Sequence, residues 1–393
     1  MTVFAAVRLA PRDPILGMTE AFNADIRPDK VNLGVGVYLD ASARVPILEC
    51  VRAASDRLAA ELKPCSYLPI DGLPSYDRAV KELVFGPESA LRERAVTVQG
   101  LGGTGALRIG AEFLRGLNPD ARVLISDPSW ENHLALFSRS GFQVSSYRYY
   151  KPGVGLDFAG MLDDLRAAAQ STIVVLHACC HNPTGYDLSA EQWAQVAEVV
   201  RERELVPFLD MAYQGFGAGI EADGRAVAEF SQRDVPLLVA NSFSKSMSLY
   251  GERVGGLTVL GKDADEAARL ASQLKVCVRT LYSNPPTHGA SIAAMVLTDP
   301  GLRQLWESEL SGMRDRIKLM RQALAARLQG LSRDFSFVTA QVGMFSYTGL
   351  SLEQMGELRE KWAVYGLDSG RICVAAINDQ NVDRVAQAIA KVL

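Results

Sequence analysis

The chain has 393 residues, of which 48% are hydrophobic and 22% are charged, and its formal net charge is -4 at pH 7. These values are typical of a globular enzyme large enough for two domains. The lack of a basic block or stripe in the sequence argues against nucleic acid as a partner. No apolar run approaches the roughly 20 residues of a membrane helix, and Met1–Ala10, interrupted by Arg8, predicts no signal peptide.

The cysteines do not suggest a metal site, because they form no CxxC pair and no metal-binding spacing. The six of them are Cys50, Cys65, Cys179, Cys180, Cys277 and Cys373. We expect reduced thiols in a cytoplasmic protein that binds no metal.

From Ala95 to Arg279, short apolar runs alternate with helical patterns. The runs are predicted to be strands covered on both faces: Ala95–Val98, Val123–Ser126, Ile173–His177, Val206–Asp210, Leu237–Ser242 and Gly256–Leu260. A helix is predicted at Ser189–Arg203, which opens with a capping box of Ser189 and Gln192. The alternation predicts an α/β fold with a mostly parallel sheet covered by helices, and with ligands beyond the carboxyl ends of its strands.

A second domain is predicted at the end of the chain. After Pro300, apolar residues recur at three- and four-residue steps as far as Leu328, which predicts a helix of roughly 40 Å, long enough to join two domains. Strand-like pieces then surround a helix predicted at Leu352–Trp362, a pattern typical of an α+β unit. These pieces are Phe335–Val338, Met344–Thr348 and Arg371–Ala375.

The segment from Ser242 to Arg253 carries the first chemical signal. Lys245 follows Ser-Phe-Ser, and Arg253 comes eight residues later. A lysine amine forms a Schiff base with the aldehyde of pyridoxal phosphate (PLP), and an arginine fork holds a phosphate by two parallel hydrogen bonds. Alone, the pattern fits a surface lysine between serines more often than a cofactor site.

Gly102-Gly103-Thr104-Gly105 follows one predicted strand and precedes a helix. Free N–H groups at a helix start bind phosphate, although a tight turn is an equally good interpretation. Asp210 ends another strand, where a carboxylate can pair with a protonated pyridine nitrogen, and Tyr213 follows three residues later. The alternative is a helix-capping aspartate with a packing tyrosine.

Three further segments carry weaker signals. The turn Asn182–Gly185 offers an asparagine to a ring substituent; the cysteines and histidines before it lack a second cluster that would complete a zinc site. Trp130 offers a ring for stacking, with simple packing as the alternative. Arg371 opens the last apolar strand and offers a carboxylate fork, with a surface ion pair as the alternative.

In their order along the chain, these motifs resemble the class I PLP-dependent aminotransferases of the aspartate and aromatic amino acid type. The resemblance runs nearly end to end, over Asn32–Tyr38, Gly103–Gly105, Cys180–Gly185, Asp210–Phe216, Ser242–Lys245, Ser283–Pro286 and Ser369–Arg371. Together, the motifs are highly specific.

The resemblance implies a cofactor site. Lys245 matches the Schiff-base lysine and proton shuttle, and Asp210 matches the partner of the pyridine nitrogen, with His133 behind it. Tyr213 and Asn182 match the partners of the cofactor's phenolic oxygen, and Trp130 the stacking ring. The phosphate-binding positions are Gly103, Thr104, Ser242, Ser244 and Arg253, with Tyr67 from a neighbouring subunit. A lowered pKa is expected for Lys245, because nearby positive charge disfavours the ammonium.

The resemblance also implies how the chain is organised and assembled. Arg371 matches the fork for the α-carboxylate, and Gly36 lies in the loop that closes over the substrate. Arg279 matches a second fork, offered across a homodimer with shared active sites. The implied division is an N-terminal arm with part of the small domain (1–45), a large PLP-binding domain (46–312) and a small C-terminal domain (313–393), so that both chain ends build the small α+β domain.

The implied activity is ping-pong transamination between an amino acid and 2-oxoglutarate. Leu39, Val45 and Ser66 replace the more polar residues of strict aspartate enzymes, which favours aromatic amino acids (Tyr, Phe) beside Asp, whereas Asn284 and Thr104 stay aspartate-like. The alternatives are an aspartate-only enzyme, a decarboxylase or lyase of the same fold, and a non-catalytic binding module.

Overall fold

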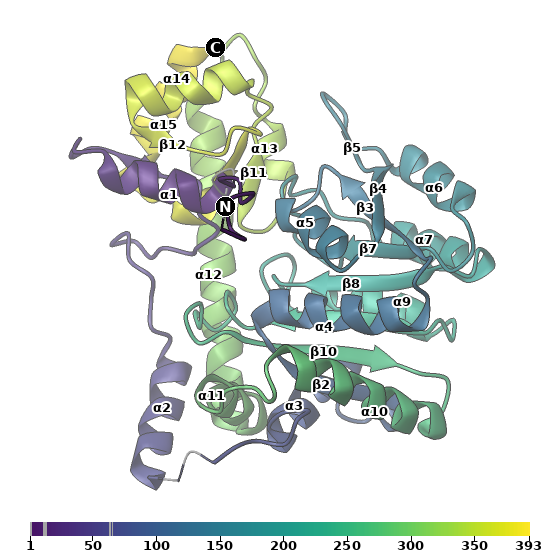
Figure 1. Cartoon of the computed structure of the whole chain (residues 1–393). Helices are drawn as coiled ribbons and strands as arrows, with labels where there is room; N and C mark the ends of the chain where they lie inside the picture. The colour runs from purple at the N-terminus through teal and green to yellow at the C-terminus, as the bar shows by residue number, and fades with distance from the viewer. Residues whose placement is uncertain (1, 11–13, 63, 65) are drawn as a thin grey trace.

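The structure is a computed structural model that describes residues 2–10, 14–62, 64 and 66–393 (Figure 1). Its centre is a seven-stranded sheet with the order β2-β10-β9-β8-β7-β3-β4. The neighbours from β9 to β4 pair in parallel, while β10 is antiparallel to both β9 and β2. The strands are β2 (Ala95–Leu101), β3 (Arg122–Asp127), β4 (Gln143–Arg148), β7 (Ile173–His177), β8 (Val206–Met211), β9 (Leu237–Ser242) and β10 (Val254–Leu260).

Both faces of this sheet are buried, as the continuous apolar runs predict. Ile173 and Val175 of β7 join a core under the helices α4 (Gly102–Leu117), α5 (Glu131–Arg139) and α10 (Ala264–Leu281). Val174 and Leu176 of the same strand join the opposite core. That core also includes α3 (Pro74–Phe85), α6 (Phe158–Ala167), α7 (Ala190–Glu202), α9 (Arg225–Ser231) and α11 (His288–Thr298).

Every strand predicted between Ala95 and Leu260 is confirmed, within three residues at either end. The helix predicted at Ser189–Arg203 is confirmed as α7, with the capping box of Ser189 and Gln192 in place. The strand β4 was not predicted. It lies at the sheet edge, and its residues Gln143, Ser145 and Ser146 are polar and largely exposed, so no apolar run marks it.

The long helix predicted after Pro300 is α12 (Pro300–Arg327), which has 28 residues. In Figure 1 it runs beside the sheet and continues into a second group of elements. This group contains α13 (Phe337–Ala340), β11 (Phe345–Tyr347), α14 (Leu352–Trp362), β12 (Val364–Tyr365), β13 (Arg371–Cys373), η2 (Val374–Ala376) and α15 (Val382–Val392). The predicted strand at Phe335–Val338 is wrong: Phe335 and Val338 are both buried, three residues apart, on one side of a helical turn.

The start of the chain packs against this second group. The strand β1 (Val31–Asn32) pairs in parallel with β12, and the helix α1 (Pro14–Ala24) lies beside them in Figure 1. The remaining elements are α2 (Glu49–Glu61), η1 (Ala90–Arg94), α8 (Ile220–Asp223) and the strand pair β5 (Tyr150–Lys151) and β6 (Gly155–Leu156). In the described part of the chain, no helix has the length and apolar character needed to cross a membrane.

Candidate active site

A buried carboxylate lies near the carboxyl end of β8, in the middle of the sheet. Oδ2 of Asp210 is 3.0 Å from Nε2 of His133, and Nδ1 of the same ring is 2.9 Å from the hydroxyl of Ser129. Burial alone would raise the pKa of Asp210, but its hydrogen bond with His133 and the surrounding charges hold the pKa below the ordinary value. Asp210 is therefore an anion at neutral pH.

Lys245 follows β9, the neighbouring strand, and points toward the same region. Its Nζ lies 5.0 Å from the ring centroid of Tyr213, a buried tyrosine whose pKa is raised by burial. Burial lowers the pKa of Lys245 to about 8; the charge of Asp210 opposes the shift, and Arg253 and Arg371 add to it. The predicted direction of the shift is confirmed, although burial is the larger cause.

An anion cradle is built from the N-terminus of α4 and the end of β9. Gly102 has a φ of +67°, and a Cβ on it would lie 2.4 Å from Nη2 of Arg253, so only glycine fits beside this guanidinium. Gly103 packs against Ser242, and Nη1 of Arg253 donates to the hydroxyl of Ser244 at 3.2 Å. The first residues of α4, which include Thr104, have N–H groups without helical partners, and this helix start lies next to one guanidinium and two hydroxyls.

A second arginine, Arg371 on β13, is 1% exposed. Its Nη1 donates to Oδ1 of Asn182 at 3.0 Å and its Nη2 to the carbonyl of Gly34 at 2.7 Å, while Nε has no partner. Within the described residues no carboxylate pairs with it. A buried guanidinium without a counter-ion is costly, so this group is suited to a carboxylate ligand.

Phe345 was missed by sequence reasoning and lies at the centre of this region. Its ring centroid is 4.2 Å from the guanidinium carbon of Arg371 and 5.8 Å from the ring of Tyr213. A Cβ on Gly36 would lie 2.7 Å from its ring, so the N-terminal segment packs directly on it. No sequence signal marks Phe345, because an aromatic residue at a strand start is common.

Trp130 is the residue that precedes the first turn of α5. Its ring centroid lies 5.3 Å from that of His133.

Some predicted residues lie apart from this cluster. Tyr67 is 92% exposed, and Arg279, also exposed, donates to the hydroxyl of Ser283 on its own chain. Val45 and Ser66 are exposed as well, whereas Leu39 is partly buried against the core. These positions therefore contribute little to the candidate site of a single chain.

The clustered residues match three functional groups of PLP: its phosphate, its ring nitrogen and its aldehyde. The cradle at Arg253 suits its phosphate, Asp210 suits a protonated ring nitrogen, and the amine of Lys245 suits its aldehyde. The unpartnered Nε of Arg371 remains for a substrate carboxylate.

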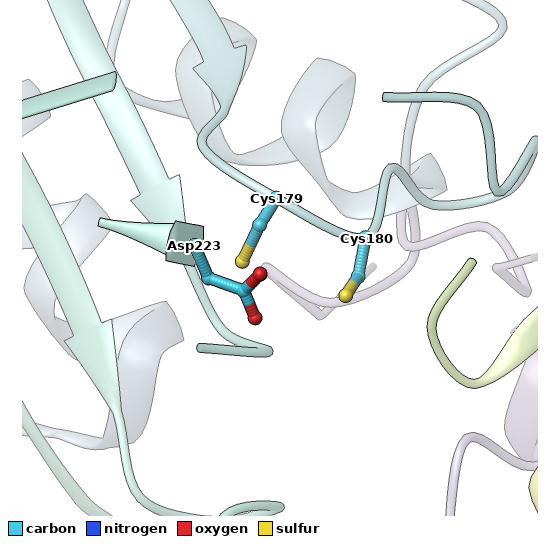
Figure 2. Close-up of side chains that lie close together, drawn as sticks. All are labelled: Cys179, Cys180 and Asp223. Carbon is cyan, nitrogen blue, oxygen red and sulfur yellow. The ribbon is translucent and has the colours of Figure 1, made fainter. Parts of the chain in front are cut away.

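Cys179, Cys180 and Asp223 form a second buried cluster, whose donor atoms lie within 4.8 Å of one another (Figure 2). The carboxylate already accepts backbone N–H bonds from Gly215, Gly217 and Ala218. A hydrogen bond with Cys180 and burial raise the pKa of Cys179. For Cys180, the hydrogen bond with Cys179 lowers the pKa, but burial together with the carboxylates of Asp187 and Asp223 raises it to about 11. Neutral thiols beside an occupied carboxylate are a poor donor set for a metal ion. Among the described cysteines all are free thiols, and Cys65 lies outside the described residues.

Three comparisons give this geometry a context. A family model described as "Aminotransferase class I and II" matches residues 28–389. The aspartate aminotransferase of Pseudomonas aeruginosa is 54% identical over 100% of both chains, and the aromatic-amino-acid aminotransferase of Escherichia coli is 47% identical over 100% of both. Among solved structures, the aromatic-amino-acid aminotransferase of Burkholderia pseudomallei, covalently bound to pyridoxal phosphate, superimposes with a TM-score of 0.98 at 58% identity over 100% of both chains.

Proposed function

The chain belongs to the class I and II aminotransferase family and is a PLP-dependent transaminase, and we propose that it accepts both aromatic and dicarboxylic amino acids, with 2-oxoglutarate as the acceptor. Relatives of both kinds match over the full length, and they do not favour a lyase or a non-catalytic module. The observation that carries transamination is the buried guanidinium of Arg371, which has no carboxylate partner among the described residues, near the amine of Lys245 and the carboxylate of Asp210.

The cofactor is proposed to be held at both ends by the sheet. The start of α4 and the residues after β9 would bind its phosphate, and Trp130 would stack on its ring. Asn182 and Tyr213 would donate to its phenolic oxygen. The phosphate ligands are Gly103, Thr104, Ser242, Ser244 and Arg253, which the anion cradle supports.

When bound, PLP delocalises the negative charge that develops on the substrate Cα. Nζ of Lys245 takes the Cα proton and later returns it, a role suited to an amine whose pKa is about 8. Asp210, anionic and held by His133, would keep the ring nitrogen of the bound cofactor protonated. Arg371 orients the substrate by its α-carboxylate, and Gly36 lies in the segment that covers it and excludes water.

The proposed breadth for side chains rests on Leu39, Val45 and Ser66. Apolar or small residues at the substrate entrance let an aromatic side chain pass. A guanidinium near the end of the substrate side chain binds the second carboxylate of a dicarboxylic substrate. We assign that guanidinium to Arg279. Its exposure on a single chain supports a site completed by a second subunit, to which Tyr67 also belongs. The assembly that follows is a homodimer with shared active sites.

We also propose the division into an N-terminal arm with part of the small domain (1–45), a large PLP-binding domain (46–312) and a small domain (313–393). The pairing of β1 with β12 supports a small domain built from both chain ends. The free thiols of the described cysteines support a cytoplasmic location.

The substrate proposal is tested by kcat/KM for aspartate, tyrosine and phenylalanine with 2-oxoglutarate. We expect the aromatic substrates within about tenfold of aspartate, a margin of about 1.4 kcal/mol. Discrimination against them by several orders of magnitude would make the protein an aspartate-only enzyme and would remove the role assigned to the residues at the substrate entrance.

A further inference from the structure

Arg321, on α12, is a buried cation that the reaction itself does not use. It is 2% exposed, and burial lowers its pKa to about 10, so it stays charged at neutral pH. Among the described residues no carboxylate forms an ion pair with it. A buried charge without a counter-ion is retained only where other polar groups solvate it.

Backbone carbonyls provide that solvation, and they all come from one segment. Nη1 donates to the carbonyl of Val338 at 3.1 Å, and Nη2 donates to those of Val342 at 3.3 Å and Gly343 at 2.8 Å. Nη2 also donates to the carbonyl of Phe345. One guanidinium therefore fixes the path of the chain from α13 to the first residue of β11.

That first residue carries the ring that packs on Arg371. The ring centroid of Phe345 is 4.2 Å from the guanidinium carbon, and β11 pairs with β13 so that Tyr347 faces Arg371. A shift of the backbone at Phe345 would thus move both the ring and the strand partner of Arg371.

Arg371 is also held by the turn that contains Asn182. Its hydrogen-bond acceptor Asn182 lies in a turn whose N–H groups at Cys180 and His181 donate to the carboxylate of Asp187, at 2.6 and 2.8 Å. The two turns are in contact: the N–H of Val342 donates to the carbonyl of Gly185 at 2.7 Å. A Cβ on Gly343 would lie 2.5 Å from Cβ of Cys180, so the turns meet without room for a side chain.

We propose that Arg321 is a positioning residue for substrate binding: by holding the carbonyls of Val342, Gly343 and Phe345, it sets Phe345 against Arg371 and so fixes the fork that binds the α-carboxylate. This rests on the proposed role of Arg371. The cofactor anchors Lys245, Arg253 and Asp210 come from the central sheet, and Arg321 contacts none of them. Its loss should therefore weaken carboxylate binding more than cofactor binding.

The test compares Arg321→Met and Arg321→Lys in the PLP-loaded enzyme, with Arg384→Met as a control for the loss of an arginine that holds a backbone carbonyl. Arg384 donates to the carbonyl of Trp362 at 2.7 Å and leaves its Nε unpartnered. Unlike Arg321 it is only partly buried and pairs with the carboxylate of Asp29 at 2.6 Å. The probe is 3-phenylpropionate, which has one carboxylate and no amino group, titrated by its effect on the absorbance of the bound cofactor. KM, kcat and retention of PLP on dialysis are measured beside it.

We expect Arg321→Met to raise the Kd of the probe, and KM for aspartate and phenylalanine, about tenfold, with kcat within about threefold, as for lost uniform binding. Arg321→Lys should fall between this variant and the parent, because an ammonium keeps the charge and loses the fork. Arg384→Met should stay within about twofold of the parent. Unchanged Kd values in folded Arg321 variants would overturn the proposal, as would parallel losses of kcat and PLP retention.

Two further variants keep the result interpretable. If Arg321→Met does not fold, Arg321→Lys decides alone, and its combination with Phe345→Leu should raise Kd by less than the product of the single effects. Independent effects would mean that Arg321 does not act through Phe345. Arg371→Lys is titrated in parallel: an unchanged Kd there removes the role of Arg371 itself, whereas a loss there with none at Arg321 removes only this inference.

Discussion

Nη1 of Arg371 donates a hydrogen bond of 3.0 Å to Oδ1 of Asn182, although 189 residues separate the two in the chain. The contact joins the last strand of the molecule to the turn that follows β7. It brings the group proposed to bind the substrate next to a group proposed to bind the cofactor. Their alignment is therefore fixed before either molecule arrives, which lowers the entropic cost of binding.

Replacing Arg371 with lysine should be damaging although the charge is kept. A single ammonium cannot reproduce two parallel hydrogen bonds, and it would leave the amide of Asn182 and the carbonyl of Gly34 without their donor. Loss of a buried charged pair costs about 2–5 kcal/mol, so kcat/KM should fall for aspartate and phenylalanine alike. A loss confined to one substrate would mean that Arg371 binds the side chain.

Asp210→Ala should lower kcat more than it weakens substrate affinity. The change leaves Nε2 of His133 without its partner and removes the buried anion that would keep the cofactor's ring nitrogen protonated, so kcat should fall by several orders of magnitude. Asp210→Glu should retain much more activity, because the negative charge persists. Steady-state kinetics of both variants decide: equal damage would indicate a packing role for the residue.

Lys245 should be the residue to which PLP is covalently attached. Borohydride reduction followed by peptide mapping should find the cofactor on the peptide that contains Lys245, and label on another lysine would contradict the assignment. Lys245→Ala should still bind PLP through the cradle at Arg253, yet lose almost all turnover. This separates attachment from cofactor affinity.

The low pKa of Lys245 gives the attachment a specific pH dependence. Its folded-state pKa of about 8 lies below the ordinary 10.5, so the ammonium dominates below pH 8 and the reactive neutral amine above it. In cofactor-free enzyme, the rate of PLP attachment should rise about tenfold per pH unit up to pH 8 and then level off. Stopped-flow absorbance measures this rate. A rise that continues to pH 10 would indicate a lysine without the shift.

Arg279 and Lys245 should complement each other between subunits. If one site takes Arg279 from the partner, the homodimers of Lys245→Ala and Arg279→Ala should each be nearly inactive with a dicarboxylate. A mixed dimer has one site with both defects and one with neither. Random pairing makes about half the dimers mixed, so refolding the two together should restore roughly a quarter of parental activity. Activity that stays at the level of the single variants would place Arg279 in its own subunit's site.

Much of the central sheet could be predicted, because buried parallel strands are marked by apolar runs and their ends by turn residues. The strands at Ile173–His177 and Leu237–Ser242 and the helix at Leu352–Trp362 have the predicted limits. Prediction failed where the local pattern was ambiguous. The run around Phe335 contains apolar residues that suit a strand or a helical turn, and only burial in the folded protein distinguishes them.

The residues of the candidate site could be predicted from the order of their motifs along the chain. Lys245, Asp210 and Arg371 each have an ordinary explanation when taken alone, and only the combination of their motifs is specific. Phe345 could not be predicted, because its importance lies in the guanidinium that it touches and not in its own type. Arg321 could not be predicted either. It lies on a long helix with both apolar and polar faces, where the sequence does not distinguish a buried arginine from an exposed one.

The antiparallel strand β10 has a mechanical consequence. Lys245 and Arg253 both lie on the single connection between β9 and β10, whose ends are tied together by the pairing of Ser242 with Gly255. The separation of the two cofactor anchors is thus set by one closed loop of the sheet. Arg371 belongs to a different sheet, the pair β11–β13. Substitutions within that pair would therefore alter the carboxylate fork without altering the spacing of Lys245 and Arg253.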